Sequence, residues 1–305
     1  MNTLELPEKS IHLKTPSHWD EMDPAQRLYC LKQAVLASAG VIRPEEALVR
    51  CFYHLADIQR DYKSLAMERV MSEEQRMEKQ SRTWLLAEAL CGFIFRKNEA
   101  NELEICYETV YNHFPVIRAG KVKLYGPDHL LADLTFGEFR AALEEMNEYF
   151  DTRESECMCR FLACLYRPER SGFAELSQRE DFDGFRREPF NRSRLPINAQ
   201  HTAKVGQVVQ TAILLWFSYL IGYIQKETLV LGGVEVSFAS LFGGGSGDER
   251  RSRGNGWVSV LHNVAKEGPF GDVEKTDRMG LFDVLLYMKD CDDQNREMKR
   301  KLKKK

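Results

Sequence analysis

A glycine-rich stretch in the last third of the chain has a composition that could suit a phosphate-binding loop. It reads GGGSGDERRSRGNG and occupies residues 243–256. A P-loop needs Gly-Lys-Ser/Thr after a strand, and a dinucleotide fingerprint needs a third glycine at fixed spacing inside a βαβ unit. The stretch has neither pattern. Glycine, serine and charged residues are typical of flexible connections, so we expect it to join two parts of the fold without binding a nucleotide.

Three cysteines lie close together in CMCRFLAC, at Cys157, Cys159 and Cys164. Structural zinc sites use two separated pairs of ligands, usually with two to four residues inside each pair. Cys157 and Cys159 have a single residue between them, and no second pair follows. On a helix Cys157 and Cys164 share a face two turns apart, so we expect them to pack as small apolar side chains.

The seven histidines are scattered and complete no catalytic or zinc-binding signature. We expect His54, within CFYHLADI, to be a hydrogen-bonded helix histidine among core residues. Adjacent acids such as Glu144 and Glu145 have the pattern of a solvated helix face. The sequence therefore predicts no catalytic residue, no metal site and no cofactor, while a site assembled from distant residues stays open.

Composition predicts a globular protein with a substantial core. The chain has 305 residues, of which 43% are hydrophobic and 29% charged, with a formal net charge of −3. A net charge this small gives no general attraction to nucleic acid or to acidic lipid. Eight cysteines, several of them within apolar helical patterns, fit a reducing cytoplasm.

One apolar segment has two interpretations. No charged residue lies between Lys204 and Lys226, and this length is close to what spans a bilayer. The segment also contains glutamines and glycines, which are unfavourable in lipid and favour a helix buried in a protein core. We therefore expect 208–224 to be a core helix with Trp216 and Leu220 facing inward. A membrane span is the alternative.

Helix and hairpin signals alternate along the chain. Asp23 and Thr135 each stand where a helix cap is expected, with Gln or Glu three residues later. Glycines between β-rich runs predict hairpins at 116–125 and 228–238. The segment 102–114 is predicted to be a further short helix. The fold class is therefore mainly α with short β-hairpins, an α+β helical globular architecture.

The same signals divide the chain into regions, of which the charged, proline-containing stretch in the middle is predicted to be a surface loop. The regions are an N-terminal helical region at 1–113, a hairpin plus helix at 114–166, the charged surface loop at 167–203, a central helix with a hairpin and C-terminal helices at 204–298, and a basic tail at 299–305.

Several stretches, taken in order, resemble a family of uncharacterised prophage-borne proteins from gut bacteria. They are PSHWDEMDPAQ, VRCFYHLADI, LYGPDHLLADLTFGEFRAA, FLACLYRPER, ILLWFSYL and GWVSVLHNVAKEGPFGDVEKTDRMGLFDVLLYM, and they extend over nearly the whole chain. The resemblance implies a virion or morphogenesis setting, near tail assembly. It carries over no catalytic residue.

The resemblance favours a non-enzymatic phage or prophage assembly factor, such as a tail-assembly chaperone or a minor structural component that binds another phage protein. We expect it in the host-cell cytoplasm or associated with the virion, with no membrane partner. The candidate partner-binding residues are Trp257, Phe270 and Leu281, because aromatic and leucine anchors commonly dominate helix docking.

The alternative function is a phage accessory protein that contacts nucleic acid through its basic C-terminal tail. Clusters of like charge at a chain end are often interaction tails, although most such ends are simply solvated. The cations of this tail are Lys299, Arg300, Lys301, Lys303, Lys304 and Lys305.

Overall fold

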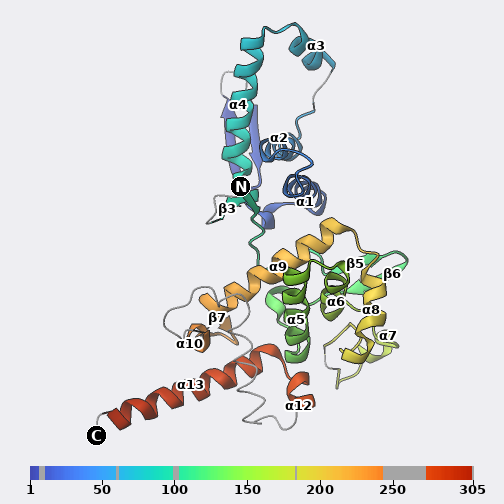
Figure 1. Ribbon diagram of the computed structural model, residues 1–305, viewed down its shortest axis with the longest axis vertical. Helices are drawn as coiled ribbons and strands as arrows, with labels where there is room; N and C mark the ends of the chain where they lie inside the picture. Colours follow the sequence, from blue (N-terminus) through green and yellow to red (C-terminus); the bar gives the residue numbers. More distant parts are fainter. Residues whose placement is uncertain (7–10, 60–61, 99–102, 183, 243–272, 304–305) are drawn as a thin grey trace. The chain divides into compact units, whose positions relative to one another are not determined.

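The computed structural model describes residues 1–6, 11–59, 62–98, 103–182, 184–242 and 273–303 (Figure 1). The chain forms two compact units, Met1–Thr109 and Val110–Lys305. In the described residues both units are mainly helical, and their strands pair as two-stranded antiparallel sheets. The predicted fold class, mainly α with short hairpins, is confirmed. The glycine-rich connection predicted at 243–256 lies outside the described residues.

Unit 1 is built from helices and two short hairpins. Two of its helices begin at a capping side chain: Asp23 and Ser72 each accept a hydrogen bond from the backbone of the following turn and complete a capping box. Its elements are β1 (Asn2–Leu6), β2 (Ile11–Thr15), α1 (Pro24–Ser38), α2 (Pro44–Leu55), α3 (Tyr62–Val70), α4 (Glu73–Cys91), β3 (Phe95–Lys97) and β4 (Leu103–Ile105).

Three buried cysteines meet where α1, α2 and α4 pack together in unit 1. Cys30, Cys51 and Cys91 are each 0% exposed. A hydrogen bond with Cys30, together with burial, raises the pKa of Cys51, and burial raises the pKa of Cys91 to about 12. The latter two thiols are therefore protonated at neutral pH. All three act as small apolar core residues.

The predicted short helix at 102–114 is wrong. Leu103–Ile105 is instead strand β4, which pairs antiparallel with β3 so that Leu103 lies opposite Lys97. Beyond it, the indole of Trp19 donates to the Cys106 carbonyl at 2.6 Å. These partners are remote in sequence, and they satisfy the backbone of this stretch without a helix.

Unit 2 is centred on α5, α6 and α9. Phe217 of α9 packs its ring against Phe139 of α5 and Phe161 of α6, at centroid distances of 5.8 and 5.3 Å. The elements of unit 2 are β5 (Val116–Ala119), β6 (Val122–Tyr125), α5 (Phe136–Thr152), α6 (Ser155–Leu165), α7 (Phe173–Leu176), α8 (Leu195–Thr202), α9 (Gln207–Lys226), β7 (Thr228–Leu231), β8 (Val234–Ser237), α10 (Ala239–Phe242), α12 (Val273–Arg278) and α13 (Leu281–Lys303).

Both predicted hairpins are confirmed in unit 2. β5 pairs with β6, and β7 pairs with β8, in antiparallel register. Gly232 and Gly233 in the second turn have φ values of +58° and +83°, and Gly120 in the first has +65°. Only glycine adopts these conformations without strain, so the glycines determine where the chain reverses.

The segment 167–203, predicted to be a charged surface loop, is more ordered and more buried than expected. It contains α7 and α8, and two of its arginines, Arg167 and Arg187, are only 1% and 3% exposed. Both guanidinium groups pair with the carboxylate of Glu138 at the start of α5. The surface prediction is wrong for these two arginines, because the partner of their charges lies far away in the sequence, while most described residues of the segment are exposed.

Helix α9 is the one helix among the described residues that is long and apolar enough to cross a membrane, and 44% of its apolar window is buried inside the protein. Trp216 and Leu220, predicted to face inward, are 2% and 0% exposed. This side of α9 contributes to the core of unit 2, as predicted.

The C-terminal helices that the structure describes are α12 and α13, and α13 continues through Lys303. The first four cations of the predicted basic tail, 299–303, are therefore part of a helix. Arg300 is exposed, and Lys301 pairs with Glu297 one turn away at 2.7 Å. Lys304 and Lys305 lie outside the described residues.

Candidate functional site

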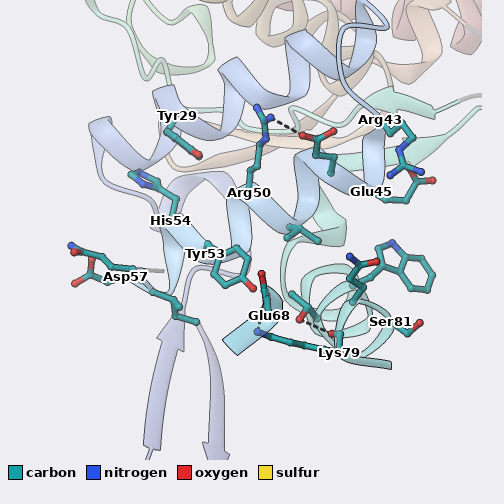
Figure 2. A pocket seen from close by; sticks show the side chains of 17 residues that line it. Tyr29, Arg43, Glu45, Arg50, Tyr53, His54, Asp57, Glu68, Lys79 and Ser81 are labelled. Atoms are coloured by element: carbon teal, nitrogen blue, oxygen red, sulfur yellow. Dashed lines mark hydrogen bonds and ion pairs between the residues drawn. The ribbon is translucent and has the colours of Figure 1, made fainter. Parts of the chain in front are cut away.

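The helices of unit 1 enclose a groove with a volume of about 1190 Å³ (Figure 2). We call it the unit 1 groove. α1, α2, α3 and α4 all contribute side chains to it. Its lining residues are Tyr29, Arg43, Glu45, Glu46, Val49, Arg50, Tyr53, His54, Asp57, Ile58, Gln59, Glu68, Lys79, Gln80, Ser81, Thr83 and Trp84.

Aromatic rings form one wall of the unit 1 groove. Tyr29 of α1 stacks on His54 of α2, with ring centroids 4.0 Å apart and an angle of 22° between the planes (Figure 2). Tyr53 precedes His54 on α2 and also lines the groove. Burial raises the pKa of Tyr29, so its hydroxyl stays neutral and can both donate and accept hydrogen bonds. Such rings offer large, rigid contact areas to a bound chain.

The prediction that His54 lies among core residues is wrong. The buried face of α2 is formed by Cys51, Phe52 and Leu55, and His54 is exposed beside it in the last turn of the helix. Helical periodicity rotates this position out of the core even though its sequence neighbours are apolar. His54 is therefore available at the groove surface.

Two ion pairs line the unit 1 groove, one between two helices and one within α2. Lys79 of α4 pairs with Glu68 of α3, with Nζ and Oε1 2.7 Å apart (Figure 2). Arg50 of α2 pairs with Glu46 at 2.6 Å and donates to Gln33 of α1 at 3.2 Å. Exposed ion pairs of this kind contribute about 0–1 kcal/mol each to stability. A ligand can therefore break them at low cost and form its own pairs with the same side chains.

The charge in the unit 1 groove is mixed. Arginine and lysine alternate with glutamate and aspartate along its lining, and the two ion pairs already neutralise Arg50 and Lys79. A phosphate-rich ligand requires an excess of positive charge, which this lining does not present. Mixed polar groups around aromatic side chains are instead typical of protein interfaces.

The described residues include no group of three or more His, Cys, Asp or Glu side chains arranged to hold a metal ion. In the cysteine cluster of α6, Cys157 and Cys164 are 1% and 0% exposed and pack in unit 2 as predicted, while Cys159 is half-buried. Burial raises the pKa of Cys164, so its thiol stays protonated.

Helix α3, beside the unit 1 groove, has no buried residue. Its apolar side chains lie in solvent: Tyr62 is 82% exposed, Met67 62% and Val70 84%. Met77, near the start of α4, is 63% exposed. A large exposed apolar area on a protein commonly marks an interaction surface. We call these four residues the α3 patch.

Of the three predicted partner-binding residues, Leu281 lies within the described part of the chain. Leu281 is 1% exposed, and its N–H donates to the Leu134 carbonyl at 2.9 Å, so it is a core residue of unit 2 at the start of α13. Trp257 and Phe270 lie outside the described residues. The α3 patch was not predicted, because the sequence shows that Tyr62 and Val70 are apolar but not that they lack a packing partner.

No known protein family, curated protein or solved structure matches the chain. The site is therefore interpreted from its own geometry.

Proposed function

We propose that the protein is a non-enzymatic assembly factor of a phage or prophage, which holds a segment of another phage protein in the unit 1 groove and against the α3 patch. The observation that carries the binding role is the position of α3, a helix with no buried side chain, directly beside an aromatic-lined groove. The phage setting comes from the family resemblance of the sequence.

The chemistry of the groove favours a helical or extended polypeptide segment with both apolar and charged side chains. Apolar anchors of the segment would contact the α3 patch and the rings of Tyr29 and Tyr53. Charged side chains of the segment would exchange with the pairs made by Arg50 and Lys79, whose partners belong to the groove itself. A chaperone for tail assembly and a minor structural component would both use such a site.

The double substitution of Met67 and Val70 by glutamate is expected to weaken partner capture about tenfold or more. A few anchor side chains carry most of the binding energy at an interface, so losing two of them lowers the affinity strongly. The two side chains are 62% and 84% exposed, so the free energy of unfolding should change by no more than about 0.5 kcal/mol per site. Capture is measured by pull-down from cells that express the surrounding prophage genes, and stability by urea unfolding.

Val230→Glu is the matched control, because Val230 is an apolar strand residue of unit 2 that is 67% exposed. It should leave both capture and stability unchanged. Equal loss of capture in the control and in the α3 variant would contradict a specific role for the α3 patch.

A further inference from the structure

The C-terminal helix α13 carries an apolar stripe with coiled-coil spacing. Seven of its positions follow one another at alternating intervals of three and four residues, which is the a and d pattern of a heptad repeat. These positions are Leu281, Val284, Met288, Cys291, Asn295, Met298 and Leu302, of which Asn295 is polar. We call the last four of them the α13 seam.

Unit 2 covers only the first half of this stripe. Leu281, Val284 and Met288 are 1%, 0% and 9% exposed, whereas Met298 and Leu302 in the seam are 57% and 73% exposed. In Figure 1, α13 runs on from α12 to the C-terminal end of the chain. The heptad pattern therefore continues beyond the residues that the described part of unit 2 covers.

Beyond its buried half, α13 is held to α10 by Arg296, which donates to the Ser240 carbonyl at 3.0 Å. Pairs between side chains four residues apart, such as Lys289 with Asp293 at 2.9 Å and Lys301 with Glu297 at 2.7 Å, are present along it. Each pair of this kind stabilises a helix by only about 0.2–0.5 kcal/mol. Short helices in water are only marginally stable without tertiary packing. A packed seam would therefore supply the stability that these pairs do not.

Charge along α13 changes from mainly acidic to mainly basic along the seam, with Arg296 and Glu297 between. Asp290, Asp292 and Asp293 make an acidic block at the start of the seam, and the basic block at its end contains Arg300, Lys301 and Lys303. Two such helices side by side in parallel would place like charges together. In an antiparallel pair, each acidic block would face the basic block of the other helix, which is favourable.

We propose that the α13 seam is a self-association surface, on which two copies of the chain pair as a short antiparallel coiled coil. In this register Cys291 faces the partner's Leu302, and Asn295 faces the partner's Met298. The acidic block of each copy faces the basic block of the other and exchanges the pairs that Asp292 and Asp293 make with Arg296 and Lys289 inside one helix. This surface belongs to unit 2, and the proposal does not depend on partner binding in unit 1.

Sedimentation of the full chain at micromolar concentration tests the association. The wild type is expected to sediment as a dimer, and Met298→Asp and Leu302→Asp as monomers with unchanged circular dichroism, since both side chains are exposed. Val230→Asp, which alters an exposed apolar residue outside the seam, should remain a dimer. A monomeric wild type, or seam variants that sediment as dimers, would overturn the proposal.

Disulfide trapping tests the orientation. In Leu302→Cys, mild oxidation by copper phenanthroline with oxygen should join Cys291 to the introduced cysteine of the partner, each bond forming as two thiols lose their hydrogens to the oxidant. A covalent dimer in this variant, absent when Cys291 is also replaced by serine, supports the antiparallel pair. Efficient trapping through Cys291 alone in the wild type would indicate a parallel pair and overturn it.

Nucleic-acid binding gives the competing explanation of the basic block. A chain that is monomeric in sedimentation, yet shifts a DNA duplex in a way that weakens as salt rises, would show that the cations serve phosphate contacts instead. That result would also overturn the proposed self-association. It would not affect the proposal for unit 1, which partner capture tests separately.

Discussion

Replacing Glu138 with glutamine is expected to destabilise unit 2 by about 3–5 kcal/mol, the cost of breaking a buried ion pair. Glu138 is 2% exposed, and its carboxylate pairs with Arg167 and Arg187, which are 1% and 3% exposed. Without that negative charge, Arg167 stays buried with no carboxylate to compensate it. Urea unfolding followed by tryptophan fluorescence measures the change.

Glu144→Gln on the same helix is the control for this prediction. Glu144 pairs with Arg192 at 2.8 Å, but both side chains are 55% exposed, so water already screens their charges. Its loss should cost no more than about 1 kcal/mol. Similar destabilisation by the two variants would show that the buried ion pairs of Glu138 contribute no more to stability than the exposed pair of Glu144.

The same cluster predicts a loss of stability in acid. Burial alone would raise the pKa of Glu138, but the charges of Arg167 and Arg187 outweigh it and hold the pKa below its ordinary value of 4.5. A lowered folded-state pKa adds stability that is complete above the ordinary pKa and disappears as the pH falls through the folded-state value. The wild type should therefore lose more stability than Glu138→Gln as the pH falls below 4.5.

Replacing Phe217 with alanine is expected to destabilise unit 2 by about 3–5 kcal/mol, because the change removes a large buried ring and leaves a cavity. Phe217 is 0% exposed and packs against Phe139 and Phe161. It therefore joins α9 to both α5 and α6. Ser218→Ala, at an exposed position on the same helix, should change the free energy of unfolding by no more than about 0.5 kcal/mol.

This prediction also separates the two interpretations of α9. If α9 is a core helix, the chain should appear in the supernatant after a carbonate wash of cell membranes, and Phe217→Ala should lower its urea midpoint. If the wild-type chain stays with the membrane after the wash, α9 spans lipid and the core interpretation is wrong.

Local signals in the sequence predicted the ends of elements well. The side chains of Asp23 and Thr135 cap helices as expected, and each completes a capping box with the residue three positions later. Gly120 and the Gly232–Gly233 pair form the two predicted turns. Each of these features depends on backbone chemistry within about four residues, so the sequence alone contains the necessary information.

Features that depend on distant partners were missed. Arg167 and Arg187 occur in a charged, proline-containing stretch and were predicted to be at the surface, yet they are buried on Glu138. Leu103–Ile105 was predicted to be helical, but it pairs with β3. Composition and periodicity do not specify which remote group satisfies a charge or a backbone hydrogen bond.

The candidate site was missed for a related reason. The sequence shows apolar residues such as Leu281 and Val70 without showing which of them are covered. The structure places Leu281 in the core of unit 2 and leaves Val70 84% exposed on α3. The anchors predicted from residue type alone therefore differ from those that the structure presents to a partner.

Photo-crosslinking from α3 tests the proposed function most directly. Tyr62, which is 82% exposed, is replaced by photoreactive benzoylphenylalanine in cells that express the surrounding prophage genes, and the adduct is identified by mass spectrometry. We expect one defined phage protein to be joined at this position and none from the same probe at Val230. No adduct from Tyr62, or the same adducts from both positions, would contradict the proposal that unit 1 holds an assembly partner.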